Sequence, residues 1–145
     1  MKNSEYADLL KKLNYREQKR IAVINSAEPF VTGLRSFLND VVIDTSIDPR
    51  FPYEFIMIYV RFVCEIEPVA SSALHNLTAD GILWFTFPKK TSRKFSSDLD
   101  RDHGWEFLND RGFDRVRQVS VDDDWTALRF RNMRFIRSAR KRENR

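Results

Sequence analysis

The chain has 145 residues, of which 42% are hydrophobic and 32% charged, and a formal net charge of +4. This length fits one domain with a sizeable core, and the single cysteine, Cys64, excludes an intramolecular disulfide framework and is expected to be a small buried residue. No apolar stretch is long enough to cross a membrane and the N-terminus lacks the apolar core of a secretory signal, so we expect a cytoplasmic protein with no membrane partner.

Apolar periodicity predicts two helices and three strands in the first half of the chain. A helix over residues 4–14 would pack on the domain or contact a second subunit of a homo-oligomer. A continuous apolar run predicts a buried strand at 20–26, and a proline in the first turn opens a helix over 29–39. Strands follow at 41–47 and 53–62. Their connection is too short for a helical crossover, so either they pair antiparallel or one is an irregular edge segment.

The second half begins with a helix over residues 65–78, a buried strand at 82–87 and, after a polar loop, a helix over 101–111. Strands at 113–121 and 125–130 are separated by three aspartates, and so short a link favours an antiparallel hairpin. The order β-α-β-β-α-β-α-β-β predicts a single three-layer, Rossmann-like α/β domain. Its sheet would be mostly parallel and would end in a C-terminal antiparallel hairpin.

Right-handed crossovers would place the first strand beside the fourth, where the winding of the sheet reverses. Their carboxyl ends would then present Asn25 and Ser26 on one side of a crevice and Lys89 and Lys90 on the other. Open α/β sheets usually bind ligands in such a crevice.

The loop after the fourth strand is rich in cations and hydroxyls, and includes Lys89, Lys90, Ser92 and Arg93. Cations ahead of a helix N-terminus favour negative charge, so we interpret these four residues, with Asn25 and Ser26, as a candidate anion site. The alternative is a solvated loop that keeps the domain soluble.

The first strand is followed by a turn that contains no glycine, and the whole chain has only four. A pyrophosphate or nucleoside cofactor needs glycines there so that the backbone can approach it closely. We therefore predict no dinucleotide or S-adenosylmethionine cofactor. Gly81 and Gly112 are expected to end helices in the left-handed conformation.

Two acidic clusters could be drawn as metal or acid/base sites, but each has a structural interpretation. Ser97 or Asp98 is expected to cap the following helix, with Asp102 beside its dipole. The cluster that starts at Asp122 is typical of a hairpin tip. We predict no metal, and we expect Trp125 to pack with Trp105 or to flank the sheet.

The C-terminal end is strongly basic: the residues from Arg129 onward carry a net charge of +7, and the remainder carries −3. We place the domain at residues 1–131 and a basic tail at 132–145. The tail either is solvated or binds nucleic acid through counterion release. The candidate cations of the tail are Arg134, Arg137, Arg140, Lys141 and Arg142. Phe135 could instead dock the tail on its own domain or on a second subunit.

Two motifs together resemble a bacterial family of methyltransferase-like Rossmann domains of unknown function. One is Pro-Lys-Lys-x-Ser from Pro88 with an acidic stretch after it, and the other is the closing Asp-x-x-Trp-Thr-Ala-Leu-Arg from Asp122. The resemblance implies a methyltransferase-like layout with the cofactor loop missing. It assigns no catalytic role, and it marks Lys89, Lys90, Asp102 and Trp125 for testing; Asp98 and Asp122 are further positions that match the family motif.

Three hypotheses for the function follow. The first is a non-catalytic domain that binds an anionic small molecule or partner at the candidate crevice. The second is an enzyme acting on a phosphorylated or carboxylated small molecule, with Lys89 or Lys90 stabilising charge and Asp98 or Asp102 as the base. The third is association with nucleic acid through the tail.

Overall fold

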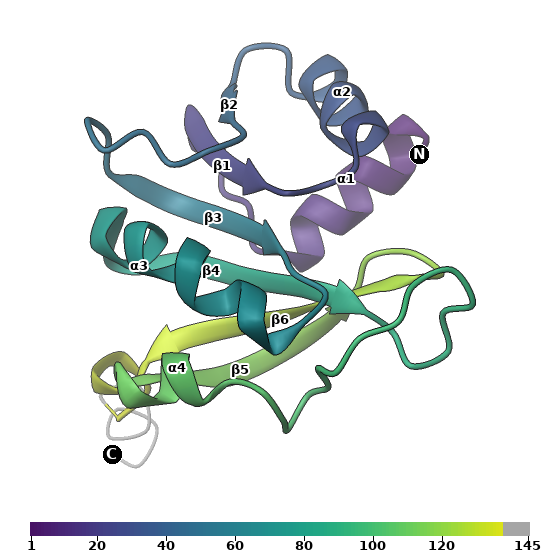
Figure 1. The fold of residues 1–145 in the computed structure, drawn as a ribbon. Helices are drawn as coiled ribbons and strands as arrows, with labels where there is room; N and C mark the ends of the chain where they lie inside the picture. Colours follow the sequence, from purple (N-terminus) through teal and green to yellow (C-terminus); the bar gives the residue numbers. More distant parts are fainter. Residues whose placement is uncertain (138–145) are drawn as a thin grey trace, which may run out of the picture.

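Six strands form one sheet in the computed structural model, which describes residues 1–137. The strands are β1 (Arg20–Ile24), β2 (Val42–Asp44), β3 (Tyr53–Tyr59), β4 (Leu77–Pro88), β5 (Phe113–Ser120) and β6 (Trp125–Asn132). Their order across the sheet is β2-β1-β3-β4-β6-β5 (Figure 1). The strands β1 to β4 run parallel, and β6 is antiparallel both to β4 and to β5.

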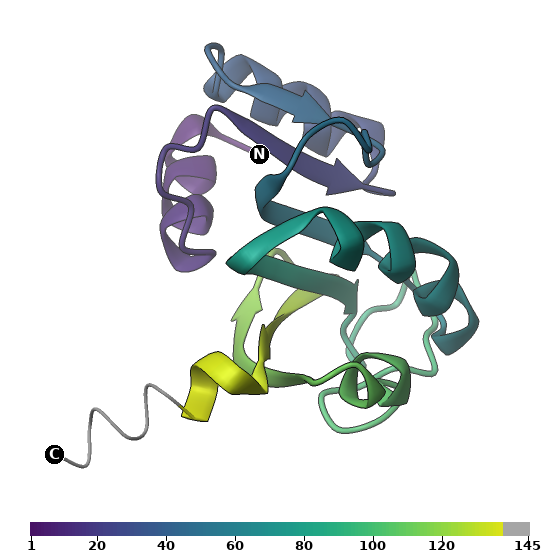
Figure 2. The same ribbon diagram turned by 90° about the vertical axis from the view of Figure 1, so that its left-hand side faces the viewer.

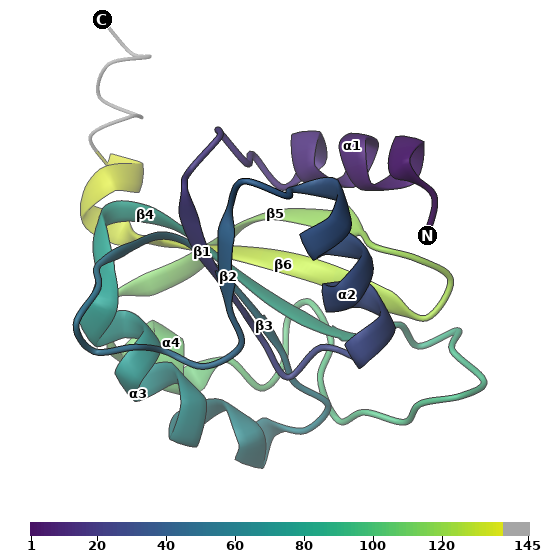
Figure 3. The same ribbon diagram turned by 90° about the horizontal axis from the view of Figure 1, so that it is seen from above.

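Helices cover both faces of this sheet. They are α1 (Asn3–Lys12), α2 (Glu28–Phe37), α3 (Ile66–Asn76) and the short α4 (Glu106–Asp110), with a 3₁₀ turn at Val63–Glu65. Figures 2 and 3 show α1 and α2 on one face and α3 and α4 on the other. The predicted three-layer α/β domain with a C-terminal antiparallel hairpin is thus confirmed.

Buried side chains on β3 explain why the sheet is covered twice. Phe55, Met57 and Tyr59 point into the core beneath α1 and α2, whereas Ile56 and Ile58 point into the core beneath α3 and α4. Alternation along a strand sends successive side chains to opposite faces, so an uninterrupted apolar run needs a layer on each side.

The helix α1 packs on the domain, through Tyr6 and α2. The Tyr6 hydroxyl donates a hydrogen bond of 2.9 Å to the carbonyl of Phe30. A Cβ added to Gly33 in α2 would lie 2.2 Å from the Tyr6 oxygen, so the two helices approach closely because residue 33 has no side chain.

The prediction that the first and fourth strands lie side by side is wrong, because β3 lies between β1 and β4. The question left open for β2 and β3 is also resolved. They do not pair, and each lies parallel to β1 on opposite sides of it. The connection over residues 45–52 contains no helix, and Ile47 and Phe51 pack against the core beneath α3. This segment covers the sheet where a crossover helix would otherwise lie.

The fourth strand begins five residues earlier than predicted, at Leu77 rather than at residue 82. Gly81 does not end a helix. Asp80 has the positive φ (55°), and the pairing with β3 shifts between Leu77 and Ile82, as at a bulge. Arg131 holds Asp80 with two hydrogen bonds, of 2.8 and 2.7 Å. The expectation for Gly112 is confirmed, since it follows α4 with a φ of +84°.

One side chain, Cys64, lies where the sequence did not predict it, whereas Trp105 and Trp125 flank the sheet, which was one of the two alternatives expected. Cys64 is exposed, because it lies in the turn after β3 and not in a strand or helix core. Trp105 and Trp125 belong to opposite faces of the sheet. Trp105 contacts Phe85, whereas Trp125 contacts Tyr59.

Within residues 1–137 no helix is long and apolar enough to span a membrane. Residues 133–137, which follow β6, are helical (Figure 2).

Candidate anion-binding site

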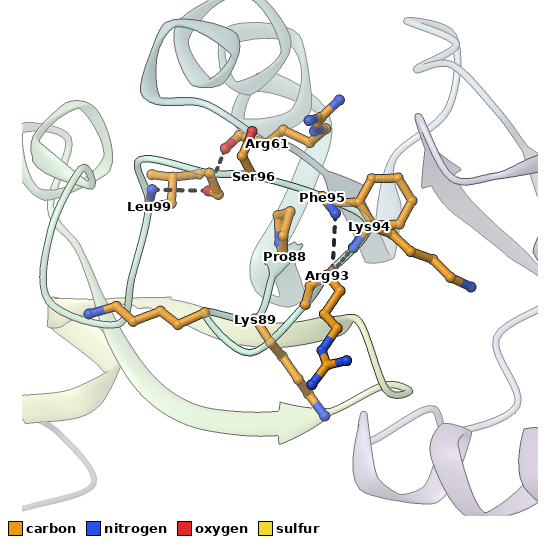
Figure 4. A pocket seen from close by; sticks show the side chains of 11 residues that line it. Arg61, Pro88, Lys89, Arg93, Lys94, Phe95, Ser96 and Leu99 are labelled. Atoms are coloured by element: carbon orange, nitrogen blue, oxygen red, sulfur yellow. Dashed lines mark hydrogen bonds between the residues drawn. The ribbon is translucent and has the colours of Figure 1, made fainter.

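A cavity of about 510 Å³ lies at the carboxyl end of β4 (Figure 4). It is lined by Arg61, Pro88, Lys89, Lys90, Ser92, Arg93, Lys94, Phe95, Ser96, Ser97 and Leu99. Five of these side chains are cations and none is a carboxylate. Most come from the loop after β4, and Arg61 comes from the turn after β3.

Hydrogen bonds fix the backbone of Arg61 at this cavity. The Glu65 carboxylate accepts from the backbone N–H of Arg61 (2.8 Å) and from that of Phe62 (2.7 Å). The Ser97 hydroxyl donates to the Arg61 carbonyl, and Asp98 accepts from the backbone N–H of Val63 at 2.8 Å. The expectation that Ser97 or Asp98 caps the next helix is therefore wrong: α4 starts at residue 106, and these two side chains join the loops after β3 and β4.

Ser92 shapes the loop after β4. Its hydroxyl donates to Asp124 (2.9 Å) and lies 3.2 Å from the backbone nitrogens of Lys94 and Phe95, which donate to it. The backbone N–H of Lys89 also donates to the Asp124 carbonyl, at 2.8 Å. The tip of the β5–β6 hairpin thus holds the cationic loop in place.

Two of the five cations are partly neutralised by carboxylates. Lys90, whose side chain is 78% exposed, lies 3.4 Å from Asp100. Lys94 lies 3.9 Å from Asp124.

The other three cations, Arg61, Lys89 and Arg93, make no ion pair within residues 1–137. Lys89 Nζ donates to the Ser120 hydroxyl (2.7 Å), and Figure 4 shows Lys89 and Arg93 extending in the same direction from the loop. The Nε of Arg61 is buried and has no hydrogen-bond partner among residues 1–137. The cavity therefore carries three positive charges that lack a carboxylate.

Arg61 was not predicted as a site residue. The predicted strand over residues 53–62 included it, so it was read as part of the sheet. Its position at the carboxyl end of a parallel strand was the available signal.

A second cavity, of about 490 Å³, shares Pro88, Lys89 and Lys90 with the first and also contains Asp100, Asp102 and His103. His103 Nδ1 lies 2.8 Å from the Asp100 carboxylate, and this hydrogen bond is the main reason that the pKa of Asp100 falls to about 2. Asp102 lies 3.2 Å from an Arg115 nitrogen.

Asp122 and Trp125 belong to the hairpin between β5 and β6. The Asp122 carboxylate accepts from the backbone N–H of Asp124 and from that of Trp125, both at 2.8 Å. Within residues 1–137 no three potential metal ligands cluster together.

Asn25 and Ser26 follow β1 at the same edge of the sheet as the lysines. None of the five cavities that we describe within residues 1–137 includes either residue. A crevice shared with Lys89 and Lys90 was predicted from the adjacency of β1 and β4, which is wrong because β3 separates them.

Aromatic side chains pack at the switch point of the sheet, between β1 and β3. The rings of Phe30 and Tyr59 lie 5.8 Å apart, and those of Tyr59 and Trp125 lie 5.1 Å apart. Phe95 continues the row, 5.1 Å from Trp125. Tyr59 is only 6% exposed, and burial raises the pKa of its hydroxyl.

The predicted tail is described only in part. Arg134 and Arg137 lie in the helical segment 133–137, and Phe135 borders a small cavity with Leu77 and Phe113. Arg140, Lys141 and Arg142 lie outside the described residues.

No protein-family model and no curated protein matches the sequence. Solved structures do match. An S-adenosylmethionine-dependent methyltransferase from Aquifex aeolicus is 14% identical, with 86% of this chain and 87% of that chain covered and a TM-score of 0.58. The N-methyltransferase NodS from Bradyrhizobium japonicum, solved with S-adenosyl-L-homocysteine, is 13% identical, with 89% and 85% covered and a TM-score of 0.54.

The residues at the switch point do not fit S-adenosylmethionine. The turn between β1 and α2, residues 25–27, contains no glycine that would let a cofactor approach the backbone. Phe30 also packs directly on Tyr59. A carboxylate about 20 residues after the first turn binds the ribose in many Rossmann domains, but here Asp44 is bound by Arg20 (2.7 Å) and by the Tyr53 hydroxyl. At these levels of identity the comparisons show the fold alone: the chain has a methyltransferase-like Rossmann fold.

Proposed function

We propose that this methyltransferase-like domain binds an anionic small molecule in the cavity at the carboxyl end of β4, and that it does so without catalysis. The observation that carries the proposal is the set of three cations, Arg61, Lys89 and Arg93, that line one cavity and make no ion pair with a carboxylate of residues 1–137. Guanidinium and ammonium groups bind phosphate and carboxylate through charge-assisted hydrogen bonds.

The size of the cavity supports a small ligand. Its volume of about 510 Å³ falls within the usual range for small-molecule sites, about 300–1,000 Å³.

The lining residues support binding rather than catalysis. They include no aspartate, glutamate, histidine or cysteine, which are common general bases. Serines and lysines do line the cavity, but within residues 1–137 no hydrogen bond joins a lining serine hydroxyl to a lining lysine ammonium, as a serine nucleophile with a lysine base would need.

One observation favours the alternative of an enzyme acting on a phosphorylated or carboxylated molecule. In the neighbouring cavity, Asp100 and His103 lie 2.8 Å apart beside Lys90, an arrangement that could move a proton next to a bound anion. In that case Asp102 or His103, rather than Asp98, would contact the substrate, because Asp98 lines neither cavity.

Calorimetric titration of the intact protein with pyrophosphate tests the binding proposal. The double variant Lys89→Ala/Arg93→Ala should lose most of the affinity, while Lys12→Ala, an exposed lysine of α1 without an ion pair, should keep it. Equal affinity in all three proteins would contradict the proposal. A variant His103→Gln that still binds but no longer turns over a phosphorylated substrate would establish the enzyme instead.

A further inference from the structure

A group of arginines lies on the sheet face that carries α1, at the end of β4 opposite to the anion cavity. Arg129 and Arg131 are two apart on β6, so they share one face, and Arg117 on β5 is the direct cross-strand partner of Arg129. Arg16, which follows α1, lines a cavity of about 420 Å³ together with Arg129 and Arg131. We name these four residues the arginine face.

The charges of the arginine face are poorly balanced. Asp80 accepts two hydrogen bonds from Arg131, and Arg16, Arg117 and Arg129 make no ion pair within residues 1–137. The Nε of Arg129 is buried without a hydrogen-bond partner. Burial, and then the neighbouring Arg131, lower the pKa of Arg129; Asp80 partly opposes this shift, and Arg117 and Arg16 add to it.

This arrangement is unfavourable for folding in the isolated protein. Like charges directly opposite each other in a sheet destabilise it, and a buried donor without a partner loses its hydration. The first of these costs falls if anionic oxygens lie against the guanidinium groups.

The surface around the arginine face is polar. The cavity that Arg16, Arg129 and Arg131 line contains no aromatic residue. It also contains Glu54, which makes no ion pair within residues 1–137. The chain continues from β6 into the helical segment 133–137, whose Arg134 lines a different cavity with Leu77 and Phe113. A cluster of guanidinium groups without an apolar centre fits phosphates better than a protein partner, whose interface core is mainly apolar and aromatic.

We propose that the arginine face binds the phosphate backbone of a nucleic acid. Because no aromatic side chain is placed there to stack on a base, the binding is independent of sequence and depends strongly on salt. The binding surface thus includes the body of the domain, from Arg16 to Arg131, and does not depend on the C-terminal tail alone.

Fluorescence anisotropy with a labelled mixed-sequence duplex, over a range of salt concentrations, tests this inference on the intact protein. The variant Arg117→Gln/Arg129→Gln should bind at least about tenfold more weakly, and its slope of log affinity against log salt should fall by about 1.8, since each lost phosphate contact removes about 0.9. The same variant should unfold at an equal or higher temperature without DNA, because a like-charge pair has been removed.

The control is Arg93→Ala, which lies in the anion cavity and should leave duplex binding unchanged. If pyrophosphate does not bind, the inference about the arginine face is therefore unaffected. If the duplex does not bind, the proposal for the anion cavity is likewise unaffected. An unchanged salt slope in the double variant would overturn the inference. So would tighter binding of polyglutamate than of the duplex, since that result would indicate an acidic protein partner.

Discussion

The switch point between β1 and β3 and the cavity beside β4 lie at the same edge of the sheet but differ in what fills them. At the switch point, the rings of Phe30 and Tyr59 pack against each other. Beside β4, Arg61, Lys89 and Arg93 line a cavity without carboxylate partners. Rossmann sheets usually bind their ligands at the switch point. The difference indicates that a fold does not by itself locate a binding site, since side chains can close one crevice and leave charge at another.

The aromatic packing at the switch point is expected to stabilise the fold. Of the variants considered, Tyr59→Ala should lower the free energy of unfolding most. Tyr59 is 6% exposed and contacts both Phe30 and Trp125, so its truncation should lower the free energy of unfolding by about 3–5 kcal/mol. Tyr59→Phe should change little, because the hydroxyl makes no hydrogen bond within residues 1–137. Chemical denaturation measures both, and a small loss for Tyr59→Ala would show that the switch point is not closed by packing.

Gly33→Ala should disturb the same region by overpacking. The added Cβ would meet the Tyr6 oxygen, and Tyr6 in turn binds the carbonyl of Phe30. We expect a loss of about 1–3 kcal/mol. Thr32→Ala, at an exposed position of α2, is the matched control and should stay within about 0.5 kcal/mol of wild type. Equal thermal shifts for both variants would argue against the close contact.

In the cavity beside β4, the two adjacent lysines should differ in how much each contributes to pyrophosphate binding. Lys89→Ala should weaken pyrophosphate binding about tenfold, since a charge-assisted hydrogen bond contributes roughly 1.5–3 kcal/mol. Lys90→Ala should weaken it less, because Lys90 is 78% exposed and pairs with Asp100. Isothermal titration of both variants gives the order, and the reverse order would move the candidate site to the cavity around His103.

The smallest effect concerns Asp100, whose pKa is lowered to about 2 chiefly by the hydrogen bond with His103. A lowered pKa stabilises the folded state above the unfolded value, about 4, and this contribution is lost as the pH falls through about 2. Asp100→Asn should therefore be less stable than wild type at pH 6, and the difference should vanish near pH 2. A difference that does not change with pH would exclude this coupling. Asp8→Asn on α1 is the control.

The sequence predicted the elements of the fold better than their arrangement. Apolar runs such as that of β3 indicated buried strands, because strands buried on both faces need no alternation. The order of the strands was wrong for β1 and β4, since the link over residues 45–52 crosses from β2 to β3 without a helix and leaves no periodic pattern. The bulge at Asp80 was also missed. A positive φ at aspartate, fixed by Arg131 from a strand 51 residues away, is a tertiary effect.

The candidate site was predicted in part. The lysines and Arg93 were selected because charge at the end of a strand is visible in the sequence, and they do line one cavity. Arg61 and the arginine face were not predicted, because their role depends on which residues lie next to them in space, and the sequence does not show this. The register that places Arg117 against Arg129 follows from a bulge at residue 116, which no local pattern indicates.

The most direct test of the central claim is a paired calorimetric titration of the intact protein with pyrophosphate and with S-adenosylmethionine. The structure predicts that pyrophosphate binds with an affinity that requires Lys89 and Arg93, and that S-adenosylmethionine gives no heat of binding. Saturable binding of S-adenosylmethionine, together with no response to pyrophosphate, would contradict the account, because it would show that the switch point opens and that the cations beside β4 hold no ligand.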